Sequence, residues 1–108
     1  MNGRDKLYDR IVMGDHLPNG DCTTSWFNCS FRGENPTLGE FLSLLLEGGE
    51  WGYVEIGERW NHNNRFEYRS GEIVSDTFTE QEKSRKIKLI AMTGGWSNMD
   101  YLVNFTED

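Results

Sequence analysis

One stretch decides the fold of this 108-residue chain: "ENPTLGEFLSLLLEGGEW", residues 34–51. Thr37 is followed three positions later by Glu40, the spacing of a capping box in which two side chains satisfy free N–H groups at the start of a helix. Apolar residues then recur at the spacing of one helical face: Leu38, Phe41, Leu42 and Leu45. Two glycines follow, and glycine readily adopts the left-handed conformation that closes a helix. The stretch therefore predicts a short amphipathic helix over residues 38–47.

Alternating apolar and polar residues flank this helix, a pattern typical of half-buried β-strands. Strands are expected over residues 24–32, 51–57, 66–69, 72–77, 85–92 and 99–105, with a short strand or extended arm over residues 8–13. Ser70 and Gly71 predict a tight hairpin, because glycine supplies the positive φ that such turns need. Residues 77–84 predict a loop or a single helical turn, with Thr77 and Glu80 as a second capping box.

These elements predict an α+β fold, in which the single short helix packs on one face of a mostly antiparallel sheet of five to six strands. The strands after the helix are expected to follow one another as hairpins. The chain length suits a single domain, residues 1–108, in which residues 1–21 form an extended N-terminal arm.

The composition indicates a folded, cytoplasmic protein. Aromatic residues make up 13% of the chain, well above their share in acidic disordered chains. No run of 18 apolar residues is present, and the N-terminal residues lack the apolar core of a signal peptide. Cys22 and Cys29 lie seven positions apart, which places them on opposite faces if one strand holds both. We therefore expect buried, reduced thiols rather than a disulfide.

The charge of the chain favours basic partners. Its net charge is −7, from 11 basic and 18 acidic residues, so we expect no direct nucleic acid binding, and the lack of an apolar span argues against a membrane partner. Six acidic residues succeed one another without a Lys or Arg between them: Glu34, Glu40, Glu47, Glu50, Glu55 and Glu58. They either keep one face soluble or form an acidic patch that docks a basic protein.

No residue pattern identifies a catalytic site, a metal site or a cofactor. The two cysteines and the two histidines, His16 and His62, lack the paired short spacing of zinc ligands. The densest cluster of hydrogen-bonding side chains is a predicted loop: Trp60, Asn61, His62, Asn63 and Asn64. Its amides either satisfy a long turn or bind a polar ligand, and His62 is its only residue that titrates near neutral pH.

The aromatic residues suggest where a partner binds. A single helix cannot cover a whole twisted sheet, so the second face has to be polar or covered by a partner. The residues expected on that face are aromatic: Trp26, Trp51, Tyr53 and Trp60. Trp96, which follows two glycines between the last two strands, either covers the end of the sheet or anchors a partner. Because large exposed aromatic patches mark interfaces, we expect binding to another protein or self-association.

The leading hypothesis is a small acidic interaction or regulatory module without catalytic activity that docks a basic target. Its size and charge also suit an inhibitor of the phage or mobile-element type. An alternative is a small-ligand-binding domain or small enzyme that uses the loop at residues 60–64 together with Trp96. A third hypothesis is a structural subunit of a larger assembly.

Overall fold

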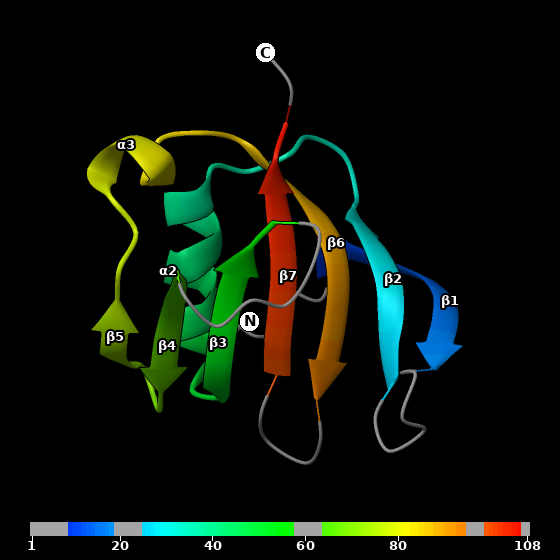
Figure 1. Ribbon diagram of the computed structural model, residues 1–108, viewed down its shortest axis with the longest axis horizontal. Coiled ribbons are helices and arrows are strands. Elements are labelled where there is room, and N and C mark those ends of the chain that lie inside the picture. The colour runs from blue at the N-terminus through cyan, green and yellow to red at the C-terminus, as the bar shows by residue number, and fades with distance from the viewer. Residues whose placement is uncertain (1–8, 19–24, 58–63, 95–98, 107–108) are drawn as a thin grey trace.

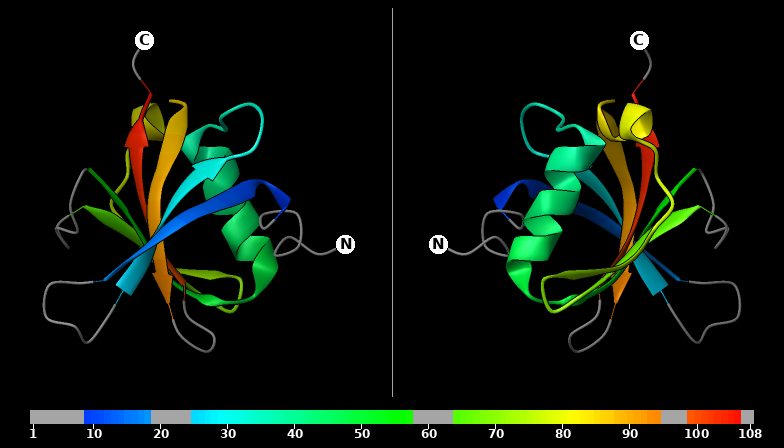
Figure 2. Two further views of the ribbon diagram at one scale, coloured as in Figure 1. Left: turned by 90° about the vertical axis from the view of Figure 1, so that its right-hand side faces the viewer. Right: turned by 90° about the vertical axis from the view of Figure 1, so that its left-hand side faces the viewer.

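The computed structural model describes residues 9–18, 25–57, 64–94 and 99–106. Within these ranges the chain is an α+β fold of seven strands and two helices: β1 (Ile11–Pro18), β2 (Ser25–Phe31), α2 (Leu38–Gly48), β3 (Trp51–Ile56), β4 (Arg65–Arg69), β5 (Glu72–Asp76), α3 (Glu80–Lys83), β6 (Ile87–Gly94) and β7 (Met99–Phe105). The strands form one strongly twisted sheet, and α2 lies across one of its faces (Figure 1, Figure 2).

The sheet is mixed, with the strand order β1-β2-β6-β7-β3-β4-β5. Five of the six neighbouring pairs are antiparallel, which confirms a largely antiparallel sheet, but β3 and β7 run parallel. The prediction of five to six strands and one helix is therefore only partly right.

The expected succession of hairpins is broken between β5 and β6. After β5, at one end of the sheet, the chain passes through α3 and returns to the middle, where β6 and β7 lie between β2 and β3 (Figure 1). Alternation of apolar and polar residues identifies a strand but not its neighbours, since it reports only which face is buried. The crossover therefore left no signal in the local sequence pattern.

The capping box that begins α2 is present as predicted. Thr37 Oγ1 accepts a hydrogen bond from the Glu40 N–H group at 3.2 Å, and Glu40 Oε1 accepts one from the Thr37 N–H group at 3.0 Å. Two backbone hydrogen bonds of 2.9 Å join residues 36–38 to residues 85–87, so the start of the helix is fixed to the start of β6. The helix runs one residue further than predicted and closes with Gly49 in the left-handed conformation.

The apolar face of α2 is buried in the core through Leu38, Phe41, Leu42 and Leu45. The Phe41 ring meets the Phe31 ring of β2 edge-on, with 5.5 Å between centroids, and the Tyr101 ring of β7 at 5.2 Å. Edge-to-face pairs of this kind stabilise by about 0.5–1.5 kcal/mol beyond the burial of the rings. The helix is therefore joined to strands from both halves of the chain.

The second capping box is wrong in its position. Thr79, rather than Thr77, caps α3, and it exchanges hydrogen bonds of 3.1 and 2.8 Å with Glu82. Thr77 lies between β5 and α3, and its N–H group donates to the carbonyl oxygen of Arg65 in β4 at 3.3 Å. Both threonines have an acidic residue three positions later, so spacing alone did not separate them.

Gly52 allows β3 to approach β7 closely, and we expect Gly52→Ala to destabilise the fold. An added Cβ would lie 2.0 Å from the carbonyl oxygen of Met99, a main-chain atom that cannot move without parting the two strands. The expected loss is about 3 kcal/mol or more in the free energy of unfolding, measured by urea denaturation. Gly33→Ala is the control: no atom lies within 4 Å of its added Cβ, so only the left-handed conformation costs about 1–2 kcal/mol. Equal losses in the two variants would contradict the close approach.

Cys29 is buried in β2, and burial raises the pKa of its thiol to about 11. Thiolate is therefore scarce at pH 8, and alkylation by iodoacetamide should be roughly 100-fold slower in the folded protein than in the unfolded chain. A Cys22→Ser background isolates Cys29, and mass spectrometry follows the modified fraction over time. Similar rates with and without denaturant would show that the thiol is accessible.

Candidate functional site

The predicted aromatic face is described only in part. Trp51 is 45% exposed, and Tyr53 is half-buried. Burial and the neighbouring negative charge of Asp100 raise the pKa of the Tyr53 phenol. Trp26 belongs to β2, but its side chain lies outside the described residues, as do Trp60, Asn61, His62, Asn63 and Trp96. The hypothesis of a ligand site at residues 60–64 thus falls almost entirely outside the described residues.

The described members of the acidic run do not form a single exposed patch, although Glu34 and Glu40 line one hollow together with Arg10 and Lys86. Glu34, Glu40 and Glu47 are exposed, Glu50 is partly buried, Glu55 is fully buried, and Glu58 lies outside the described residues. Glu34 is paired with Lys86 at 3.1 Å. Hydrogen bonds from the backbone and hydroxyl of Thr37 lower the pKa of Glu40. Glu55 is 0% exposed and therefore cannot contribute to an acidic docking surface.

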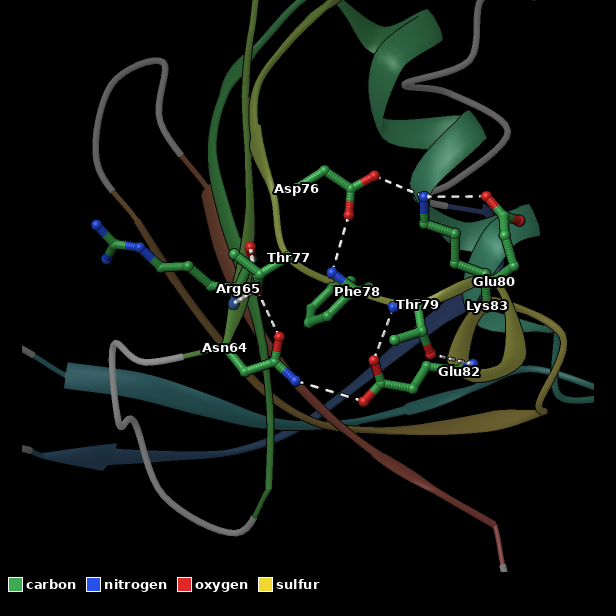
Figure 3. A network of polar contacts seen from close by, with 9 residues as sticks. All are labelled: Asn64, Arg65, Asp76, Thr77, Phe78, Thr79, Glu80, Glu82 and Lys83. Carbon is green, nitrogen blue, oxygen red and sulfur yellow. Dashed lines mark hydrogen bonds and ion pairs between the residues drawn. The ribbon is translucent and has the colours of Figure 1, made fainter.

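Asn64, the last residue of the predicted polar loop, is used inside the fold. Its Oδ1 accepts a hydrogen bond from the Thr77 hydroxyl at 2.5 Å, and its Nδ2 donates to Glu82 Oε2 at 3.4 Å (Figure 3). The Thr77 hydroxyl oxygen also accepts from the Arg65 N–H group at 2.9 Å. These contacts favour the structural interpretation of this asparagine, in which its amide satisfies the end of a long turn.

The exposed apolar side chains gather mainly at one end of the sheet. Among the described residues, four large apolar side chains are exposed: Val12 at 40%, Trp51 at 45%, Ile73 at 55% and Val74 at 58%. The last three belong to β3 and β5, whereas Val12 lies in β1 at the opposite edge. In Figure 1 strand β5 forms the left margin of the sheet. We call the group Trp51, Ile73 and Val74 the apolar cluster.

Strand β5 is an edge strand held by a tight turn. It pairs with β4 on one side, and no described strand pairs with its outer side. Ser70 and Gly71 both have positive φ, 52° and 83°, which confirms the tight hairpin predicted for them. The register shifts between Glu67 and Tyr68, so β5 carries one extra residue at this point. Such a bulge bends an edge strand and discourages unspecific pairing.

Two hollows lie beside β5. A hollow of about 240 Å³ is lined by Trp51, Tyr53, Glu67, Arg69 and Val74, among others. There the Arg69 guanidinium lies 6.0 Å from the centroid of the Trp51 ring, at the outer limit of a cation–π contact. A larger groove of about 550 Å³ is lined by residues of α2, β4, β5 and α3, including Ile73. We call the second hollow the helix-side groove.

The helix-side groove has an ion pair on its wall. Lys83 Nζ lies 2.5 Å from Asp76 Oδ2 and 3.9 Å from Glu80 Oε1, while Asp76 Oδ1 accepts from the Phe78 N–H group at 3.1 Å (Figure 3). The hydrogen bond to Asp76 raises the pKa of Lys83. Phe78 itself is buried, so this network fixes α3 against the end of β5. The groove therefore has a defined wall.

Neither a metal cluster nor a membrane-spanning helix is found in the described part of the chain. No group of three His, Cys, Asp or Glu side chains gathers as a metal site within the described ranges. No helix in these ranges is long and apolar enough to cross a membrane. Comparison of this chain with protein-family models, curated proteins and solved structures finds no match. The inference on function therefore depends on the geometry at β5.

Sequence reasoning identified Trp51 but missed Ile73 and Val74. The stretch "EIVSD" was assigned to a strand, and its two adjacent apolar residues break the alternation expected of a half-buried strand. The adjacent pair Ile73 and Val74 was therefore the sequence signal that could have identified these two exposed residues. It indicates either a strand buried on both faces or one with an exposed apolar side chain, and only the position of β5 at the edge decides between them.

We expect Lys83→Met to weaken the link between α3 and β5 and to lower the free energy of unfolding by about 1 kcal/mol at pH 7. The pKa of Lys83 is raised above its usual 10.5 in the folded state. Its contribution is therefore complete below pH 10.5 and disappears as the pH rises through the raised pKa. Urea denaturation of both proteins between pH 7 and pH 11.5 measures the difference. Lys88→Met, which removes a lysine from an exposed position in β6 outside this network, is the control. A loss of stability at pH 7 equal to that of Lys83→Met would contradict the link between α3 and β5.

Proposed function

We propose that this chain is a protein-interaction module that docks a basic partner protein along β5. The observation that carries the proposal is the exposure of Ile73 and Val74, at 55% and 58%, on a strand whose outer side no described strand pairs. The backbone N–H and C=O groups on that side are available to an extended segment of another chain. Added strands bind by such hydrogen bonds, and pockets for alternate side chains give specificity.

The two hollows beside β5 support this mode of binding. Successive side chains of an added strand point to opposite faces of the sheet. One set would meet the hollow at Trp51 and Val74, and the other would meet the helix-side groove at Ile73. A docked segment would thus cover Ile73 and Val74, which lie exposed in the chain by itself, while Trp51 stands two strands further into the sheet.

Charge favours a basic partner over an acidic one. The chain carries a net charge of −7, which attracts basic surfaces over distances of about a Debye length, roughly 8 Å at physiological salt. Glu72 and Asp76 stand at the two ends of β5 itself. An inhibitor that occupies a basic surface of its target would use the same mode, and its association would weaken with added salt.

The proposal is tested by removing apolar surface from β5 without removing strand propensity. The double variant Ile73→Thr, Val74→Thr keeps β-branched residues but loses apolar contact area. In affinity purification from the cells that naturally produce the protein, a specific partner should be recovered about tenfold less with this variant, which corresponds to about 1.4 kcal/mol.

The matched control is Val12→Thr, because Val12 is the exposed valine at the opposite edge of the sheet. Partner recovery should match that of the unchanged chain. If every protein recovered by the unchanged chain is recovered equally by the double variant, docking at β5 is wrong.

A further inference from the structure

We infer that the segment docked on β5 presents an apolar and a basic side chain on one face, and that the helix-side groove receives both. This inference rests on the proposed docking at β5. It specifies the partner segment, which is extended and has a Lys or Arg two positions away from an apolar residue. Side chains two positions apart in a strand lie on the same face. The groove provides a separate environment for each side chain.

The bulge in β5 places the two environments on the same side of the sheet. Ile73 pairs with Tyr68, and Asp76 pairs with Phe66. Tyr68 and Phe66 are two positions apart in β4, and both are buried in the core on the side of α2. Ile73 and Asp76 therefore share that side although they are three positions apart, and both line the groove. Without the extra residue, these two side chains would point to opposite faces.

The apolar part of the groove lies beside Ile73. Leu42 and Leu46 from α2 and Phe66 from β4 contribute its other apolar side chains. Ile73 is 55% exposed there, whereas Leu42 and Phe66 are buried. An apolar side chain of a docked strand, placed beside Ile73, would cover this exposed surface. The groove volume of about 550 Å³ lies in the range of pockets that enclose a ligand group.

The polar part of the groove carries an excess of negative charge. Three carboxylates line it, those of Glu40, Asp76 and Glu80, against the single ammonium group of Lys83. Lys83 is closest to Asp76, at 2.5 Å, and it lies 3.9 Å from Glu80, whose side chain is 94% exposed. Lys83 pairs with Asp76, and the positive charges of Arg10 and Lys86 act on Glu40 from outside the groove. A partner Lys or Arg would therefore find its negative counterpart mainly in Glu80, next to the apolar part. An acidic residue at the same place would be repelled.

A second copy of this chain fits β5 less well than a basic segment does. Antiparallel pairing of two copies about Val74 would place Glu72 of each copy opposite Asp76 of the other, and like charges in directly opposed positions destabilise a strand pair. Strand β5 also contains no Lys or Arg that could answer the carboxylates of the groove. The charge pattern thus selects a partner of different sequence.

The inference is tested with a library of random seven-residue peptides displayed on phage and selected on the folded chain. Selected sequences should place Lys or Arg two positions from an apolar residue. As synthetic peptides they should shift the backbone amide signals of residues 72–76 in heteronuclear NMR spectra. Glu80→Lys should weaken their binding about fivefold, because an attractive contact at an exposed position becomes a repulsive one.

Glu47→Lys is the matched control. It makes the same change in net charge at another exposed residue, in α2, that does not line the groove. Its effect on peptide binding should stay below about twofold, since an exposed charge outside the groove is screened by salt. Thermal melts of both variants verify that each remains folded.

Different results would contradict the apolar-and-basic segment inferred here and the docking at β5 on which it rests. Peptides that shift residues 72–76 but lack a basic residue, and bind Glu80→Lys unchanged, overturn the inference and leave docking at β5 standing. A library that yields no peptide acting on residues 72–76 also overturns the inference. So does light scattering that shows a dimer of the unchanged chain and a monomer of the double variant Ile73→Thr, Val74→Thr. Docking at β5 itself is tested separately, by the affinity purification with the double variant Ile73→Thr, Val74→Thr.

Discussion

The structure depends on the packing of Phe41 between rings of two distant strands. Phe41 is fully buried, with Phe31 on one side and Tyr101 on the other. Burial of a phenylalanine side chain contributes about 1.5–3 kcal/mol, and its two edge-on contacts add to this. An isolated helix of 11 residues is marginal in water, so α2 exists because this face is buried. The same contact connects β2 with β7 across β6, and it thereby holds the central strands in one sheet.

The position of α2 also determines where the sheet remains exposed. One helix is narrower than a seven-stranded sheet, and its buried residues pack over the central strands. Toward β5 the helix contributes only the side of a groove, in which Leu42 is buried while Ile73 is exposed. The hydrogen bonds at the caps of α2 and α3 and the ion pair of Lys83 keep this groove in shape. The packing of α2 over the central strands thus buries the core and at the same time leaves β5 exposed at the edge of the sheet.

Local sequence signals predicted the elements well and their arrangement poorly. The capping box at Thr37, the apolar face of α2 and the hairpin at Ser70 each depend on residues within about two turns of helix or one tight turn, and all three were predicted correctly. The parallel pairing of β3 with β7 depends on residues about 50 positions apart, and no local pattern encodes it. For the same reason the sequence did not show that β5 is an edge strand. The exposure of Val74 follows from that position rather than from its neighbours in the chain.

The burial of Glu55 is a second feature that the local sequence did not predict, and it bears on which parts of the sheet a partner could contact. Glu55 stands in a run of acidic residues that reads as a solvent-facing patch, yet it lies beside Leu102 in the middle of the sheet and both side chains are buried. Ala91, paired with Leu102, is buried as well. Neither Ala91 nor Leu102 belongs to the core cluster around α2, so the opposite face of the central strands is removed from solvent at Glu55, Ala91 and Leu102. At these three positions the described residues offer a partner no exposed apolar side chain. Among the described residues, both edge strands offer open backbone, but β5 has two exposed apolar side chains, Ile73 and Val74, and carboxylates nearby, whereas β1 has Val12.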